Sequence, residues 1–182
     1  TAKAFLKDGT TPYKPGEIWK QPELAETLKR IQEKGADGFY KGKTAKIIAD
    51  FMKKNGGIIT EKDLAKYQAQ ELKPVLGTYR GYEIVGMAPP SSGGLAVIEM
   101  LNIIEGYNLE EMGHNSAASL HVITEAMRRA FSDRAEFIGD SDFNPDLPLE
   151  KLLSKEHASN LRANIDLTKA SLSDSTHFNA KH

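Results

Sequence analysis

The sequence predicts an α+β fold that is mostly helical with a few strands. Several segments place apolar residues every three or four positions, as one face of a helix requires. Between residues 74 and 87 the pattern changes to short runs on either side of Arg80-Gly81, which is typical of a β-hairpin. A turn rich in proline, serine and glycine then leads into a strongly apolar segment, so strands and helices are joined within one chain.

This turn has the sequence Met-Ala-Pro-Pro-Ser-Ser-Gly-Gly and spans residues 87–94. The two prolines hold the backbone extended, so a helix can begin only after them, and Ser91 or Ser92 is expected to cap it. In residues 95–105, only Glu99, Asn102 and Glu105 are polar, which predicts a buried core helix. Anion binding at the helix N-terminus is the alternative, but the turn matches neither common phosphate-binding motif.

Other elements follow from periodicity and from helix-capping residues. Ala4-Phe5-Leu6 is expected to form an edge strand, and residues 37–42 a turn that carries two aromatic rings. Helices are predicted for residues 22–34, for the residues before Asn55, for a short stretch after Thr60, and for one or two segments within 149–165. Asn115 or Ser116 is expected to cap a long helix that Gly139 ends. Its predicted inward face consists of Leu120, Ile123, Met127, Ala130, Phe131, Arg134 and Ile138.

Composition excludes several classes of partner and site. The 182 residues fit one domain or part of a larger one, and the formal charge of −1 gives no basis for binding nucleic acid or a membrane surface. No apolar run has the length of a membrane span. The absence of cysteine rules out disulfides and thiolate ligands within these residues, but it does not identify a compartment.

Few side chains point to metal chemistry, and we predict neither a metal site nor a cofactor. The acidic loop over residues 140–146 has oxygen ligands at alternate positions, but Pro145 stands where a calcium loop needs glycine. His121 and Glu125 lie four residues apart without a second histidine at zinc-ligand spacing. We interpret them as ordinary surface or packing residues. The pairs Glu125 with Arg129 and Asp133 with Arg134 are interpreted as parts of a charged helix face, where each exposed pair adds little stability.

The tail contains Asp174-Ser175-Thr176-His177-Phe178, in which a hydroxyl and an imidazole are close in sequence. Alone this is weak evidence of catalysis, because sequence neighbours seldom present their side chains to each other.

Several dissimilar motifs occur in the order found in one enzyme family. They are Lys-Gly-Ala-Asp-Gly-Phe-Tyr-Lys-Gly at 34–42, Asn-Gly-Gly-Ile-Ile-Thr-Glu-Lys-Asp-Leu at 55–64, Tyr-Arg-Gly-Tyr at 79–82, Pro-Pro-Ser-Ser-Gly-Gly at 89–94 and Asp-Arg-Ala-Glu-Phe-Ile-Gly-Asp at 133–140. From about Gly16 to Phe178 the chain resembles the γ-glutamyltransferases, also called γ-glutamyl transpeptidases. The resemblance implies part of the αββα sandwich of an N-terminal-nucleophile hydrolase.

Members of this family are zymogens that cleave themselves before a threonine, which then accepts a γ-glutamyl group from glutathione and passes it to water or an amino acid. The resemblance makes Ser175 the catalytic nucleophile and Asp174–Ser175 the processing junction, with serine where the family usually has threonine. The hydroxyl can attack the preceding carbonyl, and the released α-amine, with a pKa near 8, can act as general base.

The same resemblance assigns residues 1–174 to the C-terminal part of the large subunit and residues 175–182 to the start of the small subunit. No substrate-binding residue is then expected in this chain, because Ser91-Ser92-Gly93-Gly94 is distinct from the small-subunit glycines and serines that bind substrate. The expected partners are the small subunit, the N-terminal part of the large subunit and a small γ-glutamyl substrate. Family members are periplasmic or secreted, although these residues identify no compartment.

Two alternatives remain open at this stage. The parent protein could be a related acylase that acts on cephalosporins or poly-γ-glutamate, or the chain could be a non-catalytic interaction or scaffold module. In either of the enzymatic readings, these 182 residues alone should be nearly inactive, because they lack the N–H donors that stabilise an oxyanion.

Overall fold

The computed structural model describes residues 2–173, which divide into two units at Gln70 and Glu71. The first unit contains only helices: α1 (Ala2–Phe5), α2 (Pro22–Lys34), α3 (Asp37–Tyr40), α4 (Gly42–Lys54) and α5 (Glu61–Lys66). The second contains β1 (Val75–Tyr79), β2 (Tyr82–Gly86), α6 (Gly93–Ile104), α7 (Leu109–Met112), α8 (Ala117–Phe137), α9 (Leu149–Leu153) and α10 (Lys155–Ala163).

Most predicted elements of the first unit are present. The helix over residues 22–34 is α2, and Thr60 caps α5 through the predicted capping box, in which its side chain and that of Asp63 each bind the other's backbone N–H. Two predictions were wrong. Ala4 and Phe5, expected in an edge strand, belong to the short helix α1, and residues 37–40, expected in a turn, form the helix α3. The α3 backbone lies against α2, where a Cβ added at Gly38 would stand 2.1 Å from the Arg30 carbonyl oxygen. Only glycine, which has no side chain, allows this close approach.

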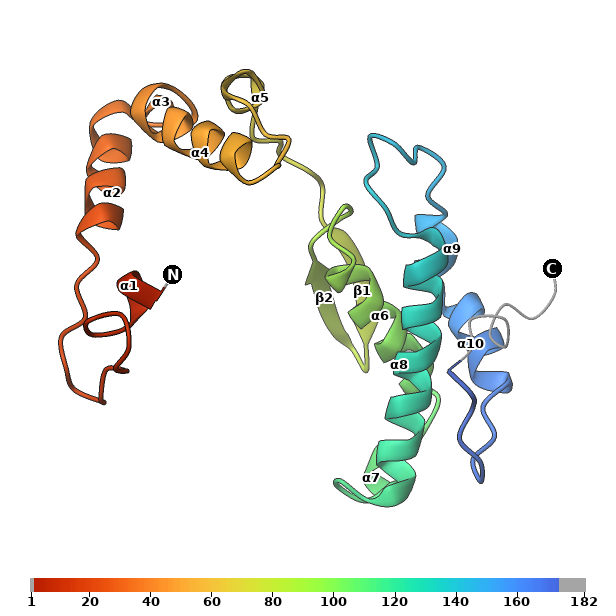
Figure 1. Ribbon diagram of the computed structural model, residues 1–182. Coiled ribbons are helices and arrows are strands. Elements are labelled where there is room, and N and C mark those ends of the chain that lie inside the picture. Colours follow the sequence, from red (N-terminus) through yellow and green to blue (C-terminus); the bar gives the residue numbers. More distant parts are fainter. Residues whose placement is uncertain (1, 174–182) are drawn as a thin grey trace. The chain divides into compact units, whose positions relative to one another are not determined.

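The second unit is built around α6. The antiparallel hairpin β1–β2 contacts one side of this helix, and α8, α9 and α10 also pack against it (Figure 1). Arg80 and Gly81 at the hairpin turn both have positive φ, which matches the right-handed twist of the flanking strands. As predicted, apolar residues of α6 are buried, including Leu95, Ile98 and Ile103. Glu99 and Asn102 are buried as well, so the polar stripe predicted for this helix also faces the interior.

The turn from β2 into α6 depends on close contact between two glycines. A Cβ at Gly94 would lie 2.6 Å from the Met87 carbonyl oxygen, and one at Gly86 would lie 2.6 Å from the Gly94 Cα. Ser92 precedes the helix but makes no side-chain capping bond, so the predicted role of this serine was wrong. Its Oγ instead accepts a hydrogen bond from Arg134 Nε of α8 at 2.8 Å.

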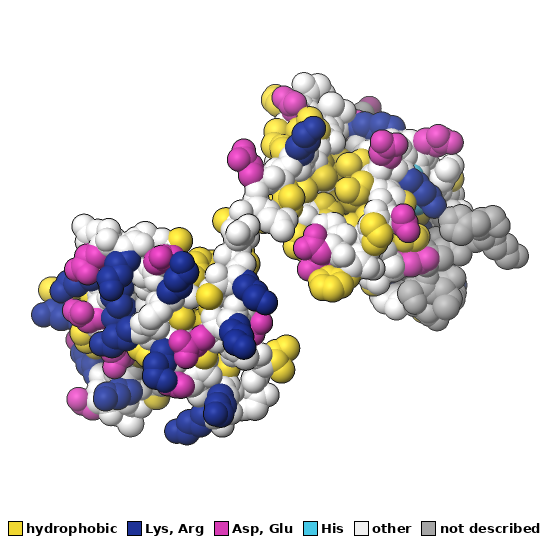
Figure 2. Space-filling model, turned by 90° about the horizontal axis from the view of Figure 1, so that it is seen from above, with side chains coloured by type: hydrophobic (Ala, Val, Ile, Leu, Met, Phe, Trp, Pro, Cys, Tyr) yellow, Lys and Arg dark blue, Asp and Glu magenta, His cyan; other side chains and the backbone are white. Residues whose placement is uncertain are grey.

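The long helix α8 begins after Ser116, as predicted, but the face that it buries is only partly the one expected. Ala130 is fully buried, as predicted, whereas the predicted inward residues Leu120, Met127 and Phe131 are about half exposed, and Ala126 is buried in addition. Small side chains allow a neighbouring helix to approach closely. This close packing determines which face of α8 is buried, although larger apolar residues lie on another face. Figure 2 shows apolar side chains gathered on one face of the second unit. No helix in the described range 2–173 has the length and apolar character needed to cross a membrane.

We expect Gly94→Ala to lower the free energy of unfolding by about 1–3 kcal/mol, because the new Cβ would overlap the backbone of Met87. Gly93→Ala is the matched control. Its Cβ would meet only Ser91 Oγ at 3.8 Å, so stability should be unchanged or raised by up to about 1 kcal/mol. Urea unfolding of both variants measures the difference, and equal effects would contradict the proposed glycine contact.

Candidate functional site

The predicted nucleophile Ser175 and the predicted junction residue Asp174 lie outside the described residues, as does His177. The structure follows the chain as far as Ser173, two residues before Ser175. The described part of the candidate site consists of residues 166–173, which lead to the predicted junction, and of the helix α8, which holds them.

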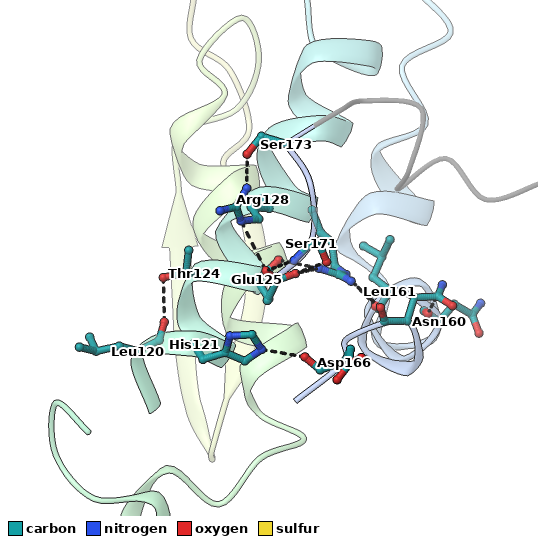
Figure 3. A network of polar contacts seen from close by, with 12 residues as sticks. Leu120, His121, Thr124, Glu125, Arg128, Asn160, Leu161, Asp166, Ser171 and Ser173 are labelled. Atoms are coloured by element: carbon teal, nitrogen blue, oxygen red, sulfur yellow. Dashed lines mark hydrogen bonds and ion pairs between the residues drawn. The ribbon is translucent and has the colours of Figure 1, made fainter. Parts of the chain in front are cut away.

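One stripe of α8 faces this segment (Figure 3). His121 Nε2 lies 2.8 Å from the Asp166 carbonyl oxygen, which can only accept, so this ring nitrogen carries the proton. Glu125 accepts two hydrogen bonds from Ser171, at 3.0 Å from the backbone N–H to Oε1 and at 2.5 Å from Oγ to Oε2. Arg128 donates to Ser173 Oγ. The stripe thus holds three points of the segment.

Arg129 links the same helix to the end of α10. Its guanidinium donates to the Leu161 carbonyl at 2.9 Å, to the Asn164 carbonyl at 2.7 Å and to Glu125 Oε2 at 2.7 Å. Both members of this ion pair are almost completely buried. Burial alone would raise the pKa of Glu125, but the hydrogen bonds from Ser171 and Arg129 hold it below its ordinary value. Glu125 is therefore an ionised acceptor at neutral pH.

The interpretation of Glu125, Arg129 and Asp133 as an exposed charged face was wrong. These three residues are between 1% and 2% exposed. Sequence analysis missed their role because their partners come from α10 and from residues 164–171, which no local pattern connects to α8. The available signal was the small residues Ala126 and Ala130 between the charges, which leave room for neighbouring chain on this face.

A groove runs along α8 next to Ser173 and has a volume of about 470 Å³. Its lining includes Thr124, Met127, Phe131 and Ala135 of α8. The described chain thus ends beside an apolar groove, at the point where Arg128 binds Ser173.

A second polar cluster, which the sequence did not reveal, lies between α6, α8 and α10. His157 Nε2 is 2.5 Å from Asp133 Oδ2 and 4.0 Å from Glu99 Oε1. Neither oxygen of Glu99 has a partner among the donors of the described residues, and the side chain is fully buried. Burial is the main cause that raises the pKa of Glu99, to about 9. The negative charge of Asp133 and a hydrogen bond with it act in the same direction. Glu99 is then a protonated acid at neutral pH and can share its proton with Asp133.

Within the described range, Glu99, Asp133 and His157 form a group of side chains that could bind one divalent cation. Their ligand atoms lie within 4.8 Å of one another. Without a cation, Asp133 bonds His157 directly, and a cation could bind only if Glu99 lost its proton. The geometry therefore fits an internal hydrogen-bonded cluster, and the sequence-based expectation of no metal site stays a prediction.

The acidic loop at residues 140–146 forms a local turn. Asp140 Oδ1 accepts the Asp142 backbone N–H at 3.0 Å, and the Asp140 carbonyl accepts from Asn144 Nδ2 at 3.0 Å. Two oxygens of Asp140 are thus bound within the turn itself.

Comparison with known proteins identifies the family. A family model described as gamma-glutamyltranspeptidase matches residues 1–182. The chain belongs to the gamma-glutamyltranspeptidase family. It is 48% identical over 169 residues to a glutathione hydrolase proenzyme of Pseudomonas sp. (strain A14), which covers 93% of this chain and 29% of that protein. This chain of the gamma-glutamyltranspeptidase family thus spans less than a third of the length of that relative.

Solved structures give the same assignment. The gamma-glutamyltranspeptidase of Helicobacter pylori is similar with a TM-score of 0.84 and 43% identity, covering 94% of this chain and 49% of that one. A cephalosporin acylase from Bacillus halodurans is similar with a TM-score of 0.78 and 32% identity, covering 90% of this chain and 30% of that one. These likenesses confirm the predicted fold class, a mostly helical α+β part of an N-terminal-nucleophile hydrolase.

The Glu99 cluster generates a prediction for stability against pH. In the unfolded chain Glu99 ionises near its ordinary pKa of 4.5, whereas in the folded chain it stays protonated up to about pH 9. The folded state binds the extra proton between these values, so the contribution of Glu99 to stability falls as pH rises through this range. Glu99→Gln keeps an N–H donor toward Asp133 without this proton linkage, and it should raise the free energy of unfolding at pH 8.

Urea unfolding at several pH values between 5 and 9 measures this effect. The stability gained by Glu99→Gln should grow with pH, by up to about 1.4 kcal/mol per unit. Glu136→Gln, which changes an exposed carboxylate on the same helix as Asp133, is the control and should show no such growth. A constant or shrinking gain for Glu99→Gln would show that Glu99 is ionised in the folded protein.

Proposed function

We propose that this chain is part of a proenzyme that transfers the γ-glutamyl group of glutathione or a related γ-glutamyl amide to water or an amino acid. The observation that carries the proposal is the family match over all 182 residues, together with 48% identity to a glutathione hydrolase proenzyme. The Asp174-Ser175-Thr176-His177 sequence lies within this match and supplies a hydroxyl at the expected nucleophile position. A self-processed N-terminal nucleophile would then carry the reaction.

In this proposal Ser175 acts twice. During maturation its Oγ attacks the Asp174 carbonyl carbon, the peptide C–N bond breaks, and the freed nitrogen takes the proton; water then cleaves the resulting ester. In turnover the α-amine of Ser175 receives the proton from Oγ, which attacks the γ-glutamyl carbonyl and expels the amine. Water or an amino acid then attacks the acyl-enzyme. Hydroxyl, α-amine and oriented N–H groups supply all of this chemistry, so we propose no cofactor.

We further propose that the chain assembles with a small subunit and with an N-terminal part of the large subunit. Support comes from the relative of strain A14, of which the chain spans 29%. The second unit also leaves large apolar side chains exposed, including Leu76, Val85 and Phe131. Exposed apolar surface of this kind is typical of sites that contact other protein.

A second candidate is an acylase of the same fold. The likeness to the cephalosporin acylase of Bacillus halodurans supports it, because the described residues resemble both kinds of enzyme. Poly-γ-glutamate is the other alternative substrate that the sequence left open. Assaying the matured full-length protein with a γ-glutamyl anilide, a cephalosporin side-chain amide and poly-γ-glutamate separates these functions. No turnover of any of the three would favour a scaffold module.

Ser175→Ala should abolish both self-cleavage and release of the anilide chromophore, with a loss of more than about a thousandfold, because no hydroxyl remains to attack either carbonyl. Ser175→Thr is the control. It keeps the hydroxyl and should retain both reactions within about tenfold of the parent. Undiminished cleavage in Ser175→Ala would contradict the assignment of the nucleophile.

A further inference from the structure

The segment over residues 166–173 has no helix or strand, and most of it is exposed. Within the described part of the chain, its hydrogen bonds to other elements go to α8, through His121, Glu125 and Arg128 (Figure 3). An irregular segment gains little order from its own backbone. Its path over the surface therefore depends on these side chains of one helix.

Glu125 provides the strongest of these anchors. Its carboxylate is buried, and Arg129 compensates its charge at 2.7 Å. Ser171 uses both its backbone N–H and its hydroxyl on this one carboxylate, at 3.0 and 2.5 Å. Hydrogen bonds to an ionised acceptor are about twice as strong as neutral ones, and two from one residue also fix its orientation.

Arg128 adds a second anchor nearer the junction. It donates to Ser173 Oγ, while its Nε lies 3.4 Å from Glu125 Oε1, so the two anchors are connected. Consecutive Cα atoms are 3.8 Å apart, so fixing Ser171 and Ser173 restricts the positions that the next two residues can reach. Ser175 Oγ is only a few bonds from the carbonyl carbon of the preceding residue, so the rate of attack depends on how the hydroxyl and the peptide are oriented. Fixing the preceding segment limits the orientations that are available.

We propose that Glu125 and Arg128 are positioning residues for self-cleavage, which hold Ser171 and Ser173 and thereby restrict how the chain enters the Asp174–Ser175 bond. The inference rests on the proposed function, since it takes Asp174–Ser175 as the scissile bond. In this step the Oγ–C bond forms, the C–N bond breaks and the proton of Oγ goes to the leaving nitrogen. Glu125 and Arg128 touch none of the reacting atoms and act only through the segment.

The test is the rate of self-cleavage of the full-length proenzyme, followed by the appearance of two chains on a denaturing gel. Ser171→Ala removes the hydroxyl bond to Glu125 and should slow cleavage about tenfold. Ser171→Thr keeps a hydroxyl and should restore cleavage to within about twofold. Thr168→Ala is the matched control, because the Thr168 hydroxyl donates to Asp166 within the same segment and to no other element among residues 2–173, and it should cleave at the parent rate.

A purely structural role is separated by melting temperature in the uncleavable Ser175→Ala background. Ser171→Ala also leaves the buried Glu125 carboxylate short of one donor, so it should melt somewhat below Thr168→Ala. Both variants should nevertheless stay folded at the temperature of the cleavage assay, so slower cleavage of Ser171→Ala cannot come from unfolding. Glu125→Gln should also slow cleavage, and adding Ser171→Ala to it should cause less than the product of the two single effects, because both changes act on one contact. Cleavage of Ser171→Ala at the parent rate, or equal slowing in Thr168→Ala, would overturn the inference.

Failure of the inference can be distinguished from failure of the proposed function. If the parent cleaves before Ser175 and releases the γ-glutamyl chromophore, while Ser171→Ala cleaves equally fast, only the positioning role is wrong. If Ser175→Ala is cleaved as the parent is, the assignment of the junction is wrong, and the positioning role falls with it.

Discussion

The buried ion pair between Glu125 and Arg129 connects the parts of the second unit that matter for the proposed reaction. Taking both charges out of water carries a large desolvation cost, which is offset only when the groups are paired and fully hydrogen-bonded. Here Arg129 binds carbonyls at the end of α10, and Glu125 binds Ser171. One pair of side chains on α8 therefore joins the helical core to the segment that leads to residue 174.

The rest of the unit holds α8 in place for this role. The hairpin β1–β2 and the start of α6 approach so closely that Gly86 and Gly94 leave no room for side chains. Asp133 and His157 then link α8 to α10 beside the buried Glu99 of α6. The polar residues inside this unit thus join three helices, where apolar packing by small residues such as Ala126 and Ala130 leaves space for them.

Sequence reasoning predicted the hairpin, most helix boundaries and the capping of α5 and α8, because these depend on neighbouring residues. The inward face of α8 could not be predicted in the same way. Its large apolar residues Met127 and Phe131 suit a core, but the helix buries Glu125, Arg129 and Asp133, whose partners outside α8 lie 24 to 46 residues away in the chain. Periodicity records polarity along one helix and contains no information about such distant partners.

The same distinction applies to the site. The tail motif and the family resemblance predict a nucleophile at Ser175, which stays a prediction, whereas the residues that hold the preceding segment emerged only from the fold. The most direct test is the intact mass and N-terminal sequence of the two chains from the full-length protein. The account predicts cleavage between Asp174 and Ser175, with a smaller chain that begins Ser-Thr-His. A single uncleaved chain, or a different new N-terminus, would contradict it.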